Sequence, residues 1–183
     1  MSPRSLRERP VDLFFVAVCL LFASTSFFVD AATLLATWVT GNPHAWPLAP
    51  VNIALYAAAD PLLVEEPVFL RVAMALSGFV WGPLYLYMAW GFYTARHAIR
   101  APSLAYGAAL TGIMLLIVAE ELFSEVDGWR SPNPALFLAF NLPYFLFPLA
   151  VMVRMWRPFP FGVPPELEGL SPAARRALGL REG

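Results

Sequence analysis

Carboxylates inside apolar stretches are the residues of this sequence best suited to chemistry. Asp30 lies well inside the first long apolar stretch, and Glu120 and Glu121 lie near the end of the third. A charged side chain at the centre of a membrane helix costs about 2.5–3.5 kcal/mol on insertion scales, so each carboxylate there is a functional candidate by default. Asp60, before the second stretch, and Glu125, after the third, are expected on the same side of the membrane. One outward-opening cavity, acid-lined and otherwise apolar, could therefore collect several of them.

A plainer interpretation stays open for the third stretch. Glu120, Glu121 and Glu125 also stand where a helix would meet water, with the stem buried and the carboxylate in the interface. Asp30 does not fit this interpretation, because the apolar run AATLLATWV follows it and leaves it at membrane depth, where it needs a partner or a proton. We expect a ligand-binding or catalytic role for Asp30.

The elements that hold these carboxylates follow from composition and length. Of 183 residues, 59% are hydrophobic and 14% are charged, with a mean hydropathy of +0.62, so the chain is too apolar for an ordinary soluble domain. About 20 apolar residues in a helix cross the hydrocarbon core of a bilayer. The stretches of this length are 11–39, 68–94, 103–124 and 134–156. The sequence predicts an all-α, polytopic integral membrane protein, a bundle of four transmembrane helices with an internal hydrophobic cavity.

The other polar residues exclude several classes of function. The 12 basic and 13 acidic residues give a formal net charge of -1, so no basic face is available for nucleic acid. Every basic residue is an arginine, which excludes chemistry that needs a lysine. The single cysteine, Cys19, and the two histidines, His44 and His97, are too few for a disulfide framework or a metal cluster. We expect no metal and no cofactor.

The positions of the arginines predict the orientation in the membrane, because short cytoplasmic segments carry the basic excess. The basic groups are Arg4, Arg7 and Arg9 at the start, Arg96 and Arg100 in the second connection, and Arg154, Arg157, Arg175, Arg176 and Arg181 at the end. In a four-span arrangement all three groups lie on one side, so both termini are predicted to be cytoplasmic. The membrane would be the endoplasmic reticulum in a eukaryote and the plasma membrane in a bacterium.

The remaining segments divide the chain into a membrane part and two tails. We expect a cytoplasmic N-terminal tail over 1–10, a membrane domain over 11–157 and a flexible cytoplasmic tail over 158–183, in which 171–178 could form a short surface helix. The first connection contains an apolar segment with prolines, 45–64. This segment is expected to lie along the interface or to fold back between the helices as a lid.

Polar and aromatic side chains spaced three or four residues apart indicate which helix faces could line the cavity. The stripes are Ser26 and Asp30 on the first span, Met74, Ser77 and Trp81 on the second, and Asn141 and Tyr144 on the fourth. Trp81 is assigned to the pocket. Tyr85, Tyr87 and Trp90 are assigned to an aromatic belt at the membrane interface.

Two short motifs and their spacing resemble a known family. Asp60-Pro61-Leu62-Leu63 is followed by Trp81-Gly82-Pro83, and the weaker matches are Phe28-Val29-Asp30, Ser124-Glu125, Asp127-Gly128-Trp129 and Asn141 with Pro148. Over about residues 11–157 the chain resembles the EXPERA superfamily of the emopamil-binding protein, a sterol Δ8–Δ7 isomerase, and the sigma-2 receptor. The resemblance implies a small helical membrane bundle whose hydrophobic cavity receives sterols and cationic amphiphilic drugs.

Departures from the isomerase pattern weaken the case for catalysis. In those enzymes the resemblance implies that acidic groups protonate a ring alkene, stabilise the carbocation and remove a proton from its other side. Ser26 stands where the isomerases have a histidine, and Met74 where they have a second catalytic glutamate. Ser77 replaces a glutamate of the sigma-2 receptor, and Tyr144 replaces a tryptophan of the isomerases. The retained polar residues are Asp30, Asp60 and Asn141.

Three functions stay open from the sequence. The favoured one is a membrane protein that binds a sterol-like or isoprenoid lipid, and cationic amphiphiles, between Asp30 and Asp60. The second is a double-bond isomerase in which Asp30 and one of the glutamates Glu120, Glu121 and Glu125 act as acid and base. The third is a non-catalytic scaffold, which predicts a closed bundle without a cavity. The sequence is also compatible with a homodimer of this chain.

Overall fold

The computed structural model describes residues 6–42, 45–48, 56, 59–162, 167, 170 and 174. The regular elements among these residues are helices. Four helical stretches in this part of the chain are long and apolar enough to cross a membrane, namely Pro10–Thr40, Val68–Thr94, His97–Phe123 and Pro134–Met155. The predicted all-α fold with four membrane-spanning helices is confirmed.

The first span is one helix interrupted by a wider turn. It consists of α1 (Pro10–Thr25), a π-helical segment η2 (Ser26–Ala31) and α2 (Ala32–Thr40). Proline suits the first turn of α1, because the N–H groups there have no partner within a helix. Gly41 ends the span with a left-handed φ of 70° and donates its N–H to the carbonyl of Thr37.

The second span repeats this construction. After the short helix α4 (Leu62–Glu65) it runs through α5 (Val68–Leu76), the π-helical segment η4 (Ser77–Trp81) and α6 (Gly82–Thr94). Pro83 would clash with the carbonyl of Phe79 in a regular α-helix. Here Phe79 lies in the π-helical turn, which is wider. The first and second spans therefore both carry a π-helical segment near their middle.

The third span begins earlier than residue 103, where the sequence analysis placed its start. It comprises a 3-10 turn, η5 (His97–Ile99), and α7 (Arg100–Phe123). Arg100 is a helical residue whose guanidinium donates to the carbonyl oxygens of Met155, Trp156 and Arg157 at 2.9–3.1 Å. These carbonyls end the fourth span, α8 (Pro134–Met155), and would otherwise lack donors. Hydropathy alone does not reveal this contact, because it joins two helix ends far apart in the chain.

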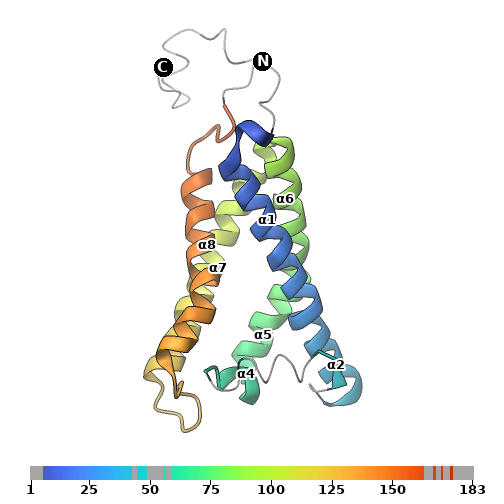
Figure 1. Cartoon of the computed structure of the whole chain (residues 1–183), viewed down its shortest axis with the longest axis vertical. Helices are drawn as coiled ribbons and strands as arrows, with labels where there is room; N and C mark the ends of the chain where they lie inside the picture. Colours follow the sequence, from blue (N-terminus) through green and yellow to red (C-terminus); the bar gives the residue numbers. More distant parts are fainter. Residues whose placement is uncertain are drawn as a thin grey trace.

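The four spans form two helix pairs (Figure 1). α1 packs along α6, and α7 packs along α8. The pairs meet at the end where α1 begins and α8 ends, and they diverge toward the end that carries α2 and α4. Aromatic rings join α1 to α8, since Phe15 lies 5.8 Å from Phe147 and Phe22 lies 4.6 Å from Tyr144 between ring centroids. The bundle is thus closed at one end and wider at the other.

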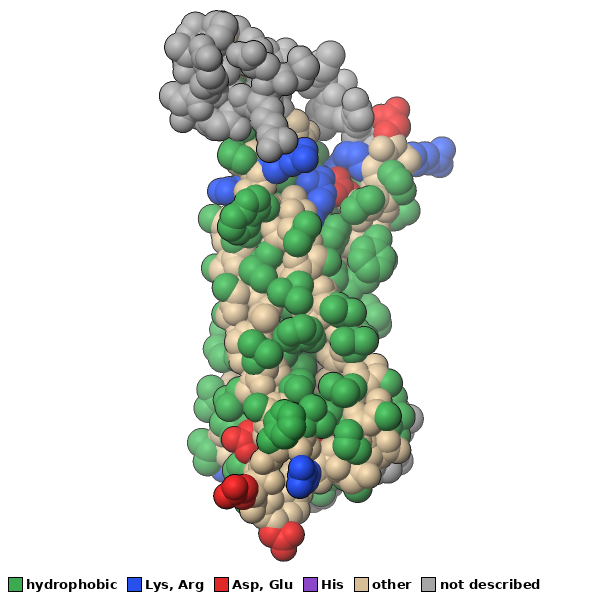
Figure 2. Space-filling model, turned by 90° about the vertical axis from the view of Figure 1, so that its left-hand side faces the viewer, with side chains coloured by type: hydrophobic (Ala, Val, Ile, Leu, Met, Phe, Trp, Pro, Cys, Tyr) green, Lys and Arg blue, Asp and Glu red, His purple; other side chains and the backbone are tan. Residues whose placement is uncertain are grey.

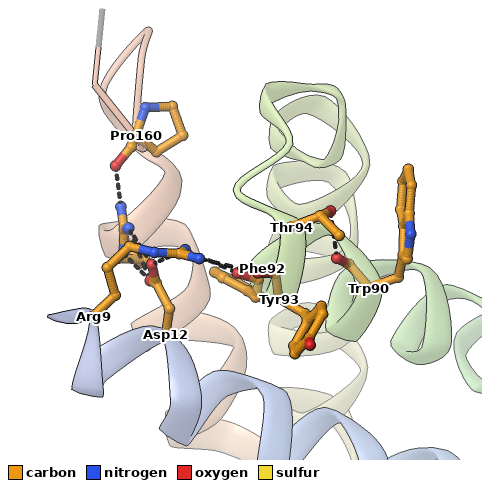
Figure 3. A network of polar contacts seen from close by, with 8 residues as sticks. Arg9, Asp12, Trp90, Phe92, Tyr93, Thr94 and Pro160 are labelled. Atoms are coloured by element: carbon orange, nitrogen blue, oxygen red, sulfur yellow. Dashed lines mark hydrogen bonds and ion pairs between the residues drawn. The ribbon is translucent and has the colours of Figure 1, made fainter. Parts of the chain in front are cut away.

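A cluster of buried ion pairs stabilises the helix contacts at the closed end (Figure 3). Asp12 is 1% exposed and accepts from Arg9 at 2.8 Å and from Arg154 at 2.8 Å. Arg9 also donates to the carbonyl oxygens of Phe92 and Tyr93 near the end of α6. One carboxylate therefore joins α1, α6 and α8. Asp12 is not recognisable from the sequence, because an acid in the first turn of a helix is usually solvated and favoured by the helix dipole.

The face formed by α7 and α8 has the surface of a membrane protein (Figure 2). Hydrophobic side chains cover its middle as a band, and charged side chains lie at its two ends, with most of the visible arginines at the closed end. The exposed hydrophobic residues of α7 and α8 include Leu115, Leu116, Leu138, Leu142, Leu146 and Val153. Such a band would be an aggregation hazard in water, and it matches the hydrocarbon core of a bilayer.

Two predicted segments lie largely outside the described residues. In the predicted lid, 45–64, residues 49–55 and 57–58 are not described. In the predicted tail helix, 171–178, Ala174 is the described residue. The lid and the tail helix therefore stay predictions.

Candidate ligand-binding site

A cavity of about 160 Å³ lies between the two helix pairs, in the half of the bundle where they diverge. Its apolar lining residues are Val29, Leu63, Leu70, Ala73, Met74, Leu110, Ile113, Met114, Ile117 and Phe140. Its polar lining residues are Thr25, Asp30, Tyr56, Asp60, Ser77, Trp81, Tyr85, Asn141 and Tyr144. Among these described residues there is no arginine and no histidine. The formal charges of the lining are those of Asp30 and Asp60.

Most of the predicted cavity residues meet here. The lining includes Asp30, Asp60, Met74, Ser77, Trp81, Asn141 and Tyr144, which come from three spans and the first connection. Ser26 stands behind the lining, where it is 2% exposed and hydrogen-bonded to Ser77. The helical spacing of three and four residues therefore identified one inward face on each of three spans.

The two π-helical segments pack against each other and position Asp30. Ser26 Oγ and Ser77 Oγ are 3.0 Å apart, so one hydroxyl donates to the other between η2 and η4. Gly78 permits the close approach, because a Cβ at this position would lie 2.5 Å from Ala31 Cβ. π-helical turns are rare and are frequent at functional sites. No sequence signal indicated the widened turns.

Asp30 lies on the cavity wall in η2 and is partly buried. The Ser77 hydroxyl, whose Oγ lies 3.0 Å from Ser26 Oγ, is a polar neighbour of its carboxylate. The ion pairs between described residues both involve Asp12, and no arginine lines the described cavity beside Asp30. A carboxylate has about four acceptor positions, and one hydroxyl leaves capacity for a donor on a ligand.

Asp60 is 7% exposed and lies where the first connection reaches the cavity. Its Oδ1 accepts the N–H of Leu63 at 3.1 Å, and its Oδ2 lies 3.5 Å from Asn141 Nδ2, which is a long hydrogen bond. The first contact shapes the turn into α4, and the second ties this turn to α8. Asp60 therefore holds the wall in shape and also exposes a negative charge to the cavity.

Tyr56 is a cavity residue that sequence reasoning missed. Its ring packs on Phe140 of α8, with centroids 5.0 Å apart. Burial raises the pKa of its phenol, and the negative charges of Asp60 and Asp30 raise it further. Tyr56 therefore stays a neutral hydrogen-bond donor beside both carboxylates at neutral pH.

The three candidate glutamates lie outside the cavity lining. Glu121 is 0% exposed and stands behind the wall, where its Oε1 accepts the N–H of Leu62 at 3.1 Å. Glu120 is partly exposed, and Glu125 is exposed in the connection after α7. The carboxylate that accompanies Asp30 in the cavity is thus Asp60.

Tyr85 corrects the aromatic-belt prediction. It is 3% exposed, lines the cavity, and places its hydroxyl 3.1 Å from that of Tyr106 on α7. The prediction was wrong for Tyr85 because this residue follows Trp81 by four positions and shares its inward face. Tyr87 and Trp90 do point outward, with 37% and 48% of their surface exposed.

A family comparison agrees with this geometry. Residues 51–155 match the family described as EXPERA (EXPanded EBP superfamily). The chain belongs to this family. EXPERA membership supports a membrane protein of the sterol-binding or isomerase-like class, and it agrees with the four membrane-spanning helices of the described chain. Comparisons with curated proteins and with solved structures give no match.

The EXPERA match covers Asp60 and the second, third and fourth spans. Asp30 and the π-helical segment η2 precede it. The geometry of the cavity is therefore what joins Asp30 to the EXPERA residues Asp60, Trp81 and Asn141.

Proposed function

We propose that this EXPERA protein binds a sterol-like or isoprenoid lipid, and also cationic amphiphiles, in the cavity between its helix pairs. The lining carries the proposal, because apolar side chains from several spans enclose a space whose charged residues are Asp30 and Asp60. Apolar walls suit a hydrocarbon skeleton, and a few placed polar groups orient it. The scaffold hypothesis predicts a closed bundle without a cavity, so the cavity favours the binding hypothesis over it.

Asp30 is the proposed counter-ion of cationic ligands. Asp60 already accepts a backbone N–H from Leu63 and faces the amide of Asn141. Asp30 has the Ser77 hydroxyl as its neighbour and no arginine in the described chain. A cation that leaves water for an apolar cavity needs such a carboxylate, because an unpaired charge there is costly.

Filling the cavity tests the proposal. Ala73→Phe would place a phenyl ring in the lining contributed by α5. We expect the affinities for a neutral 3β-hydroxysterol and for a tertiary-amine amphiphile to fall together, by about tenfold or more, since each tenfold is ~1.4 kcal/mol of lost contact. Equilibrium binding to protein in lipid nanodiscs measures both. Ala108→Phe on the exposed face of α7 is the control and should change neither. Unchanged binding by Ala73→Phe would reject this cavity as the site.

A double-bond isomerase is the second candidate, and the presence of two separate carboxylates on one cavity favours it. One would act as acid and the other as base on opposite sides of a carbocation. Asp60 takes the place that the sequence analysis gave to Glu120, Glu121 or Glu125. Incubation with a Δ8 sterol in heavy water should then move the alkene and add one deuterium, and Asp60→Asn should stop both changes. A sterol recovered unchanged and unlabelled would remove this candidate.

We also propose that both termini lie in the cytoplasm. Arg9, Arg96, Arg100 and Arg154 all belong to the closed end of the bundle, which supports this orientation by the positive-inside rule. The cavity would then lie toward the outer or luminal half of the membrane. Homodimerisation and the particular membrane stay predictions.

A further inference from the structure

Glu121 is a buried acid that the proposed lipid site does not use directly. It lies near the end of α7, is 0% exposed, and accepts the N–H of Leu62 through Oε1 at 3.1 Å. Its backbone carbonyl accepts the N–H of Ser131, and the Ser131 hydroxyl donates to the carbonyl of Ala59. These hydrogen bonds join residues 59–62, before the second span, to α7 and to the connection that follows α7.

The other carboxyl oxygen of Glu121 lacks a donor. Oε2 is buried, and no N–H or O–H group of the described residues reaches it. Its neighbour is the carboxyl group of Asp60, because Oε1 of Glu121 and Oδ1 of Asp60 accept the N–H groups of the adjacent residues Leu62 and Leu63, each at 3.1 Å. Two carboxylates are acceptors only, so this contact becomes a bond when one of them carries a proton.

No cation compensates the two acids within the described chain. The ion pairs between described residues join Asp12 to Arg9 and Arg154, and neither involves Asp60 or Glu121. Arg130, which follows α7, donates through Nε to the carbonyl of Leu122. Two adjacent negative charges in a buried site repel strongly, and one shared proton removes the repulsion and satisfies Oε2.

The hydrogen bonds indicate which acid holds the proton. Asp60 has two donors of its own, the N–H of Leu63 and the amide of Asn141, and donors favour the charged form of a carboxyl group. Glu121 has one donor, the N–H of Leu62. In this bond Oε1 can be the carbonyl oxygen of a protonated carboxylic acid, which leaves Oε2 as the hydroxyl that donates. The neutral member is therefore Glu121.

We propose that Glu121 is a protonated carboxylic acid that donates to the Asp60 carboxylate and acts as the positioning residue of this cavity wall. The Asp60–Glu121 pair then carries one negative charge, and this charge is on Asp60, which lines the cavity. A ligand therefore meets two negative charges, at Asp30 and Asp60. This deepens the proposed lipid site, and its binding test rests on that proposal.

Infrared difference spectroscopy tests the proton without any ligand. In the spectrum of wild type minus Glu121→Gln, we expect the C=O stretch of a protonated carboxylic acid, because the variant loses that group. Glu120→Gln, one residue away on the same helix, is the control and should leave the band in place. A spectrum in which Glu121→Gln removes only carboxylate bands overturns the proposal. This result does not depend on lipid binding, so it is separate from a failure of the proposed function.

Binding of two probes tests the positioning role. Glutamine imitates the protonated acid, since its oxygen can accept from Leu62 and its amide can donate to Asp60. Glu121→Gln should therefore keep the affinity for a tertiary-amine amphiphile within about twofold, whereas Glu121→Leu, which loses both bonds, should weaken it by about tenfold. An ionised Glu121 would give a different result, in which Glu121→Gln loses the amine selectively and keeps a neutral 3β-hydroxysterol. That selective loss would overturn the proposal.

Discussion

Asp30→Asn is expected to weaken the binding of a tertiary-amine amphiphile by about thirtyfold or more, while a neutral 3β-hydroxysterol keeps its affinity. Removing one partner of a buried charge pair costs about 2–5 kcal/mol, and ~2 kcal/mol corresponds to about thirtyfold in a dissociation constant. Asparagine has nearly the size of aspartate and retains an oxygen that can accept from Ser77. The cavity should therefore keep its shape and lose its charge at this point.

Competition binding with both ligands on the same nanodisc preparation measures this difference. Glu125→Gln removes an exposed carboxylate outside the cavity and should leave both affinities unchanged. A proportional loss of sterol and amine in Asp30→Asn would mean that Asp30 acts through the fold of the wall. Retention of full amine affinity would show that Asp30 is not the counter-ion.

Asp12→Leu is expected to give the largest loss of stability, about 3 kcal/mol in the free energy of unfolding. Asp12 is the common partner of Arg9 and Arg154, whose side chains are 13% and 22% exposed. Without the carboxylate, two largely buried guanidinium groups face each other near Phe161, which lies 5.0 Å from the Arg154 guanidinium. The contacts between α1, α6 and α8 at the closed end would be weakened together.

Thermal unfolding of the purified protein in detergent measures this effect. Asp127→Leu, in the exposed connection after α7, is the control and should change stability little. The double variant Asp12→Leu with Arg154→Leu should be more stable than Asp12→Leu alone, because it removes one of the uncompensated charges. A double variant that loses the sum of both single effects would show that the ion pair is not the source of the stability.

The membrane spans could be predicted closely from the sequence. Bilayer thickness sets the length of each helix, and in lipid the backbone N–H and C=O groups of a span must form their hydrogen bonds within that helix. The third span was the exception. Its start was placed too late because the role of Arg100, which binds the carbonyls that end α8, depends on a contact between distant parts of the chain.

The candidate site could be predicted in part. Asp30, Ser77 and Trp81 follow from the cost of polar groups in lipid and from helical spacing. Tyr56 could not be found in this way, because it belongs to a connection whose path no periodic pattern describes. Asp12 was missed because its partners, Arg9 and Arg154, come together only when the two ends of the chain meet at the closed end.

Composition and hydropathy are enough to predict a membrane protein with four spans and few carboxylates, of which Asp30 lies at membrane depth. Which carboxylates share a cavity follows from the packing of the helices, which places Asp30 and Asp60 on its wall, Glu121 behind it and Glu125 outside. Hydropathy cannot make this distinction, because the lipid and the protein core are both apolar. Hydropathy therefore leaves the rotation of each helix about its axis open, and only helix packing decides which side faces inward.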